Sequence, residues 1–270
     1  MTSTSESTQQ SRPVSTAAVV AHGRVDVDEA LDRVRTVAEA AGVSLVDDPR
    51  EADIAVALGG DGTILRTLAK LLGSRVPVIG VNFGRVGFLA SIAPERLETD
   101  LARVLRGEYR VVELPTLDVE LNGDRHVAVN DVVATSSTLG RMVELAWAVG
   151  GEDLGTVPCD GMICATPSGS TAYNLSNGGP VLVRGIDALA VTFIAPHSLH
   201  ARPLVVPRGL AVSVANRTPD VGCAVLADGH RIGEIAPAGE IAISLGEPRS
   251  LLATLPETTF FGRYRETFAS

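Results

Sequence analysis

Residues 53–72 read DIAVALGGDGTILRTLAKLL, which is a strand pattern, a glycine turn and a helix pattern in immediate succession. Ligands of open α/β sheets bind beyond the carboxyl ends of the strands, where helix N-termini favour anions. Gly59, Gly60 and Gly62 let the backbone approach a phosphate, and Asp61 places an acid beside it. The turn is therefore a candidate phosphate site, the alternative being a plain capping turn that carries an acid.

The sequence around this stretch predicts an α/β domain with a parallel sheet. Strand patterns at 14–21, 43–46 and 76–81 alternate with helix patterns at 27–41 and 94–105. Alternation of this kind is typical of parallel strands that are joined and covered by helices.

The pattern changes near residue 109 to short β-rich runs, which predict an α+β second domain with two sheets. The expected strands are 117–121, 126–134, 143–149, 161–165, 190–194, 211–215 and 224–226, with one helix at 170–176. Asn122-Gly123 and Gly150-Gly151 are hairpin-like turns. We expect four parts: a disordered tail at 1–12, the α/β domain at 13–108, the β-rich domain at 109–240, and a segment at 241–270 that returns to the first domain.

Composition excludes several classes of function. The net charge is −9 without a long basic run, so we expect no nucleic-acid partner. Lys70 is the single lysine and lies in a helix pattern, which argues against Walker-A and protein-kinase sites. The three cysteines match neither a disulfide framework nor a zinc spacing, and no apolar run reaches membrane-spanning length. We therefore expect a cytoplasmic protein without a membrane partner.

Three further polar features are candidates for ligand contact. Arg66, one helical turn beyond the glycines, can reach an anion at the helix start or lie solvated. Asn130 and Asp131 offer an amide and a carboxylate to paired sugar hydroxyls, but adjacent strand residues face opposite ways, so a bulge or strand end is needed. The run 166–176 (TPSGSTAYNLS) supplies hydroxyls and a helix start, and Tyr173 either stacks on a base or lies in the core.

Taken together, these segments resemble the NAD kinase family. The segments that match are GGDGTILR at 59–66, GVNFGRVGFL at 80–89, VNDVV at 129–133, CDGMICATPSGSTAYNLSNGGP at 159–180, APHSLHARPLVV at 195–206 and LADGHR at 226–231. The GGDGT motif also occurs in lipid kinases, and phosphofructokinases carry a related motif. TPSGSTAY, in contrast, is specific to NAD kinases. The resemblance implies an NAD kinase-like fold with the active site between the domains. It also implies transfer of the γ-phosphoryl of ATP to the adenosine ribose of NAD, Mg²⁺ on the ATP phosphates, and a homodimer or homotetramer.

The resemblance also implies roles for individual residues. Asp61 is the expected general base, and Asn130 and Asp131 are expected to hold ribose hydroxyls. The residues expected around the adenine and its sugar are Thr171, Ala172, Tyr173, Asn174 and Ser176, with Asp160 at the adenine end, from a neighbouring subunit. Further expected ligand contacts are Arg66, Arg141, Ala195 and His230.

The sequence departs from the family pattern at two positions. It also leaves two alternative functions open. Asp131 replaces the common glutamate, and Pro158 stands where some relatives carry arginine, which leaves polyphosphate open as a donor. A lipid kinase of the diacylglycerol type would share GGDGT but leave the loop at 166–176 unexplained. A catalytically silent NAD(P)-binding sensor would have no need of Asp61.

Overall fold

The computed structural model describes residues 9–10, 12–21, 27–84 and 87–269, so most of the expected tail at 1–12 lies outside it. The chain divides into two compact units: unit 1 runs to Leu114 and resumes at Arg249, and unit 2 is Pro115–Pro248. These bounds differ by several residues from the expected divisions at 108/109 and 240/241. The reason is that the long strands β6 (Arg110–Leu121) and β17 (Glu240–Thr254) each carry residues of both units.

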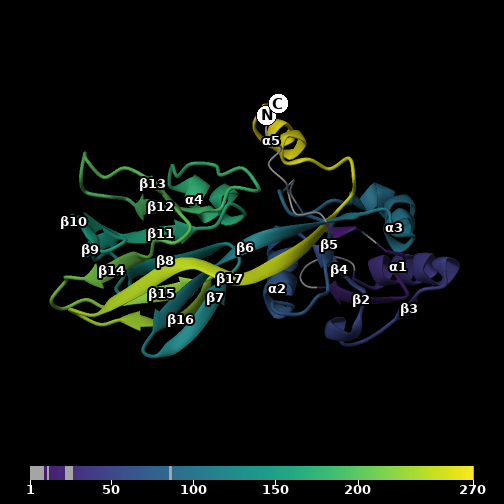
Figure 1. Ribbon diagram of the computed structural model, residues 1–270, viewed down its shortest axis with the longest axis horizontal. Helices are drawn as coiled ribbons and strands as arrows, with labels where there is room; N and C mark the ends of the chain where they lie inside the picture. The colour runs from purple at the N-terminus through teal and green to yellow at the C-terminus, as the bar shows by residue number, and fades with distance from the viewer. Residues whose placement is uncertain (1–8, 11, 22–26, 85–86, 270) are drawn as a thin grey trace. The chain divides into compact units, whose positions relative to one another are not determined.

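Unit 1 is the expected α/β domain, with a parallel sheet in the order β3-β2-β4-β5-β17 (Figure 1). Its other strands are β1 (Gln9–Gln10), β2 (Thr16–Ala21), β3 (Ser44–Leu45), β4 (Ile54–Gly59) and β5 (Val78–Asn82). Its helices are α1 (Val27–Ala41), α2 (Asp61–Lys70), α3 (Leu97–Leu105) and α5 (Phe260–Phe268), with 3-10 turns η1 (Pro49–Glu51) and η2 (Pro94–Arg96). Gln9–Gln10, inside the expected tail, pairs with the start of β6.

Helices cover both faces of this sheet. Alternate residues of β4 and β5, including Val56 and Ile79, share a buried cluster with apolar residues of α1 and α3. On the other face, Gly80 lies so close to α2 that a Cβ there would be 2.2 Å from the Ile64 Cδ1 atom. Because β4 is buried on both faces, it reads as an unbroken apolar run in the sequence.

Unit 2 is antiparallel and has two sheets, as expected. One sheet has the order β13-β12-β11-β8-β15-β16, and β10, β9, β14 and the first part of β17 pair in that order in the other. The bounds are β7 (Asp124–Ala128), β8 (Asp131–Ser136), β9 (Val143–Val149), β10 (Glu152–Cys159), β11 (Gly161–Ala165), β12 (Ala188–Ile194), β13 (Leu204–Pro207), β14 (Val212–Asn216), β15 (Cys223–Ala227) and β16 (His230–Ile235). The expected helix is split into η3 (Gly169–Thr171) and α4 (Tyr173–Ser176).

The core of unit 2 lies between its two sheets. Trp147 of β9 meets Phe193 of β12 edge to face, with ring centroids 5.4 Å apart.

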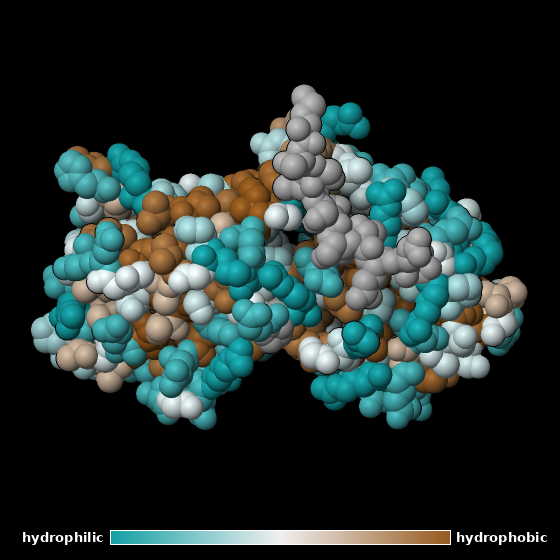
Figure 2. Space-filling view, in the orientation of Figure 1, coloured by the Kyte–Doolittle hydropathy of each residue, from teal (hydrophilic) through white to brown (hydrophobic). Residues whose placement is uncertain are grey.

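Figure 2 shows apolar residues at the surface over the part of unit 2 that Figure 1 labels β12 and β13. The exposed side chains of β13 and the loop before it include Leu199, Leu204 and Val205, at 85%, 40% and 43% exposure.

One expected strand, 126–134, is wrong: it is two strands. β7 ends at Ala128 and pairs with β6, whereas β8 begins at Asp131 and pairs with β11 and β15. Asn130 therefore lies between the strands and Asp131 starts the second one. This is the strand end that the pair needed if both residues are to serve one ligand.

Candidate active site

The Asp61 carboxylate is held in place by the loop that follows β5. Its Oδ2 atom accepts a hydrogen bond of 2.7 Å from the Phe88 N–H. The Leu89 N–H lies 3.3 Å from both carboxylate oxygens. Each carboxylate oxygen has two lone pairs, so Asp61 can still accept a proton or a further hydrogen bond.

The position of Asp61 in the fold suits an anionic ligand. β3 lies on one side of β2 and β4 on the other, so the chain changes direction at the β2–β4 pair. Such switch points are where open α/β sheets bind ligands. Only Gly60, the N-cap, separates β4 from Asp61, which is the first residue of α2. The first N–H groups of a helix lack carbonyl partners within it, so they are available to a phosphate.

Glycines let the backbone pack around the acid. A Cβ on Gly87 would lie 2.3 Å from Asp61 Oδ2, so any side chain there would displace the carboxylate. Gly59 is buried at the end of β4, and its carbonyl accepts the Phe83 N–H at 3.0 Å. The exposed residues of this turn are Gly62 and Arg66.

Arg66 folds back toward the start of its own helix. Its Nη2 atom lies 3.5 Å from the Thr63 hydroxyl, and a Cβ on Gly62 would be 3.9 Å from Nη1. The guanidinium thus lies at the exposed first turn of α2, and its contact with an anion there stays a prediction.

A half-buried carboxylate orients Asn130 and Asp131 in unit 2. Asp228, which follows β15 with a φ of 49°, accepts the N–H groups of Val129, Asn130 and Asp131 at 2.8, 2.7 and 3.2 Å. The Asp228 N–H in turn donates to the Asp131 carbonyl at 3.0 Å. This reciprocal contact ends β7 and sets the start of β8. We did not single out Asp228 from the sequence, although it lies within the LADGHR segment.

Burial changes the acidity of this carboxylate pair. Burial and, as the smaller cause, the neighbouring Asp228 charge together raise the pKa of Asp131 to about 7. Burial also raises the pKa of Asp228, against the lowering effect of its three N–H donors. A neutral Asp131 can donate as well as accept a hydrogen bond.

The loop at 166–171 packs against Asn130. The Thr166 N–H donates to the Asn130 carbonyl at 2.8 Å, and a Cβ on Gly169 would lie 2.0 Å from the same oxygen. Within the described part of the chain, Asn130 Oδ1 and Ser168 Oγ are buried without a hydrogen-bond partner. Buried polar atoms usually have partners, so these two are candidates for ligand contact. Ser168 is a second residue that we did not single out from the sequence.

The remaining residues of the loop differ in exposure. Tyr173 is 45% exposed rather than in the core, and Ser176 is exposed. Thr171 and Ala172 are half-buried, and the Thr171 hydroxyl donates to the Ser168 carbonyl at 3.1 Å. All four residues are therefore at least partly accessible to a ligand.

Asn174 differs from its neighbours in the loop because it is buried. Its side chain is fully buried; Oδ1 accepts the Thr192 hydroxyl at 2.7 Å, and Nδ2 donates to the Ser170 and Pro180 carbonyls at 3.0 Å each. Both amide protons and the carbonyl are occupied inside the protein. The side chain therefore holds the loop on β12, and a nucleotide contact by Asn174 stays a prediction.

Four more residues of unit 2 were expected to contact ligand. Arg141 forms an exposed ion pair with Asp220 at 2.9 Å. Asp160 has an exposed side chain, and its carbonyl accepts from Thr135 and Ser136. Ala195, just after β12, has a φ of 42°. His230 is exposed, and its Nδ1 atom lies 3.1 Å from the Asp228 carbonyl oxygen. The structure thus brings His230 to the Asn130–Asp228 cluster, and it records no contact of Arg141, Asp160 or Ala195 with that cluster among the described residues.

Comparison with known proteins gives the family. A model of the ATP-NAD kinase N-terminal domain matches residues 7–109, and a model of the ATP-NAD kinase C-terminal domain matches residues 129–254. An NAD kinase of Heliobacterium modesticaldum is 37% identical over 241 residues, which are 87% of this chain and 85% of the relative. The chain belongs to the NAD kinase family. The predictions of the family and of a phosphotransferase that acts on NAD are thereby confirmed.

A further relative and two solved structures agree with this chain in length or fold. An NAD kinase of Thermomicrobium roseum is 34% identical over 261 residues, covering 93% of this chain and 89% of its own. The crystal structure of an Archaeoglobus fulgidus NAD kinase in complex with ATP matches 94% of this chain and 97% of its own, at a TM-score of 0.78 and 29% identity. A yeast NADH kinase complexed with NADH, 20% identical, shares the fold at a TM-score of 0.85, covering 95% of this chain and 88% of its own.

Proposed function

We propose that this protein transfers the γ-phosphoryl group of ATP to the 2′-hydroxyl of the adenosine ribose of NAD, forming NADP and ADP. The observation that carries the proposal is the placement of the Asp61 carboxylate. It lies at the start of α2 and is held by two backbone N–H groups of the loop that follows β5. An Archaeoglobus fulgidus relative binds ATP, which supports ATP as the donor.

Asp61 acts as the base in this proposal. It accepts the proton of the 2′-hydroxyl while the oxygen bonds to the γ-phosphorus and the bond to ADP breaks. Phosphoryl transfer depends mainly on positioning and charge neutralisation, which the N–H groups of the glycine turn supply. A well-placed base contributes about 10²–10⁴-fold.

Unit 2 supplies the groups that bind NAD. The unpartnered oxygens of Asn130 and Ser168 suit ribose hydroxyls, and a neutral Asp131 can donate to one. The exposed ring of Tyr173 is suited to stack on the adenine. The residues that we propose as further contacts are Arg66, Arg141, Asp160, Thr171, Ala172, Ser176, Ala195 and His230.

Mg²⁺ remains part of the proposal. Among the described residues, no group of three or more His, Cys, Asp and Glu side chains is arranged to hold a metal ion. Mg²⁺ commonly binds through substrate phosphates, so it would be held by the phosphates of ATP, and Asp61 stays free to act as the base. When bound, it would neutralise charge on the transferring phosphoryl group.

One assay tests the proposed reaction and its alternatives. We would measure NADP formation from NAD or NADH, with ATP or polyphosphate, in Mg²⁺ or EDTA, and phosphorylation of diacylglycerol in parallel. The proposal predicts NADP from NAD, ATP and Mg²⁺ and no lipid product. Tight NADP binding without turnover would favour the silent sensor instead.

We also propose that the protein is a cytoplasmic homodimer or homotetramer. No helix within the described residues is long and apolar enough to span a bilayer. β13 is at the edge of its sheet and carries the exposed Leu204 and Val205, a surface suited to self-association. Sedimentation of the purified chain tests this: a monomer at all concentrations would contradict it.

A further inference from the structure

The C-terminal helix α5 packs on the loop that holds Asp61. Phe88, whose N–H donates to Asp61, is only 9% exposed. Its centroid lies 5.8 Å from the ring of Phe260 and 5.8 Å from that of Phe268. Phe260 and Phe268 are the first and last residues of α5, so both ends of the helix contact this ring.

A hydrogen bond fixes the same loop two residues further on. The Arg263 Nη2 atom donates to the Ala90 carbonyl at 2.8 Å, and Arg263 Nη1 pairs with Glu266 at 3.0 Å. The Leu89 N–H, which also points at Asp61, lies between these two anchored residues. Helix α5 therefore holds the loop on either side of the second donor.

The loop needs such outside support. Residues 87–90 have no helix or strand structure, and they lie between the end of β5 and the start of η2. Backbone hydrogen bonds to β5 begin only after these residues, where the Ser91 and Ile92 N–H groups donate to the Gly80 carbonyl at 3.1 Å each. The described contacts between α5 and these residues join positions that are more than 170 residues apart in the sequence.

We propose that α5 is a positioning element for Asp61: its docking on Phe88 and Ala90 keeps two N–H groups aimed at the carboxylate. The proposal rests on the proposed role of Asp61 as the base. Phe260, Arg263 and Phe268 are then positioning residues, which act on the reaction through Asp61 without touching a substrate.

Arg263 gives the sharpest test, because its loss should leave the fold intact. We would compare Arg263→Met with Arg263→Lys, which can still donate to the Ala90 carbonyl, and with Arg265→Met, an exposed position on the same helix. For Arg263→Met we expect kcat to fall by about tenfold to 10²-fold, since small displacements of reacting groups cost this much. The KM values for NAD and ATP should stay unchanged, Arg263→Lys should restore most of kcat, and Arg265→Met should match the wild type.

A second readout follows the loop itself. In Arg263→Met, amide hydrogen exchange at Phe88 and Leu89 should speed up, while exchange in β4 and β5 stays as in the wild type. In an Asp61→Asn background, Arg263→Met should cause no further loss of kcat, because residues that act as one unit are not additive.

The outcomes separate the two proposals. Unchanged kcat and unchanged exchange at Phe88 and Leu89 in Arg263→Met would overturn the role of α5, as would an equal effect in Arg265→Met or an additive loss in the Asp61→Asn background. Absence of NADP formation by the wild type would instead overturn the proposed function. The exchange measurement needs no substrate and still decides whether α5 orders the loop.

Discussion

Gly87 matters because it has no side chain. Its backbone lies against Asp61, where a Cβ would be 2.3 Å from Oδ2 and 2.4 Å from Oδ1. The loop therefore comes close to both oxygens of the carboxylate. A contact this tight leaves the carboxylate little freedom to turn toward or away from a substrate.

We expect Gly87→Ala to lower kcat by about 10²-fold, because the methyl group would push the carboxylate out of place. The measurement is steady-state NADP formation, with thermal unfolding as the check that the chain still folds. Wild-type kcat in this variant would show that the Asp61 position is not as constrained as the contact indicates.

Asp131 makes stability depend on pH. Its pKa is about 7 in the folded protein against an ordinary 3.8, so between about pH 4 and 7 the folded chain keeps a proton that the unfolded chain has lost. The folded state binds more protons in this window, so stability falls as the pH rises through it.

Asp131→Asn should remove this fall. Urea unfolding at a series of pH values from 5 to 8 should show a flatter profile, with the variant more stable than wild type at pH 8 by up to about 4 kcal/mol. Asp160→Asn, which changes an exposed carboxylate of the same unit, is the control. Parallel profiles for Asp131→Asn and the wild type would contradict the conclusion that the pKa of Asp131 is raised in the folded protein.

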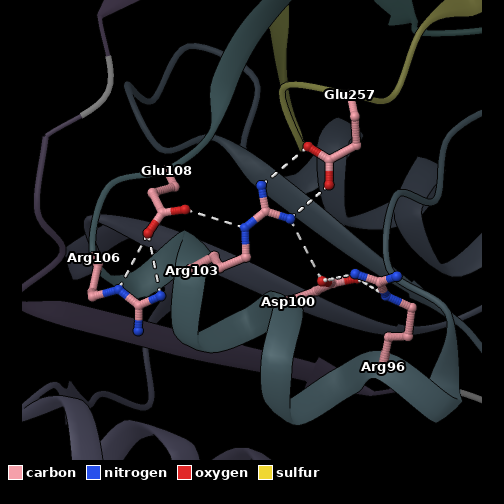
Figure 3. A network of polar contacts seen from close by, with 6 residues as sticks. All are labelled: Arg96, Asp100, Arg103, Arg106, Glu108 and Glu257. Atoms are coloured by element: carbon pink, nitrogen blue, oxygen red, sulfur yellow. Dashed lines mark hydrogen bonds and ion pairs between the residues drawn. The ribbon is translucent and has the colours of Figure 1, made fainter.

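At the scale of elements, a polar network ties α3 to the segment before α5 (Figure 3). Arg103 of α3 donates to both oxygens of Glu257, at 2.6 and 3.1 Å, and to Glu108 at 3.1 Å. Asp100, with a side chain 4% exposed, pairs with Arg96 at 3.0 Å and lies 3.7 Å from Arg103. Glu257 is three residues before α5, so the network anchors the approach to that helix.

Arg103→Met should lower the thermal midpoint by a few degrees at low salt, because Glu257 and Asp100 lose a shared partner. The effect should shrink at about 1 M NaCl, since salt screens exposed charges. Arg35→Met is the control, because Arg35 forms an exposed pair with Asp32 within α1. A loss of the same size at both salt concentrations would point to packing of the Arg103 stem instead.

Elements fixed by local pattern were predictable from the sequence. Helix α1 spans 27–41 as its spacing of apolar residues indicates, and β9 and β11 match their expected ranges. The Asn122-Gly123 turn joins β6 to β7 through two residues with φ of 55° and 87°. In these places short-range preferences and the tertiary fold agree.

Elements fixed by distant contacts were not predictable in this way. The run 126–134 reads as one strand, and the break at Asn130 comes from Asp228, whose carboxylate takes three N–H groups 97 to 99 positions away. The motif marks Asp61, but its N–H donors lie 27 and 28 positions further on. Asn174 belongs to the family motif, but its burial against β12 depends on the tertiary fold and cannot be predicted from the motif.

At the scale of the whole molecule, unit 1 is completed by the end of the chain. The residues from Arg249 onward return to unit 1 after the whole of unit 2. They add the end of β17 beside β5 and then α5 against the Asp61 loop. Both units carry groups that the proposed reaction needs, and unit 1 depends on the last residues of the chain to hold its acid.

The most direct test of this account is kcat for NADP formation from NAD and ATP by Asp61→Asn, measured beside the Kd for NAD. The substitution keeps the size of the side chain and removes the base. We predict a loss in kcat of about 10²–10⁴-fold with an unchanged Kd for NAD. A kcat close to that of the wild type would contradict the central claim that Asp61 takes the proton.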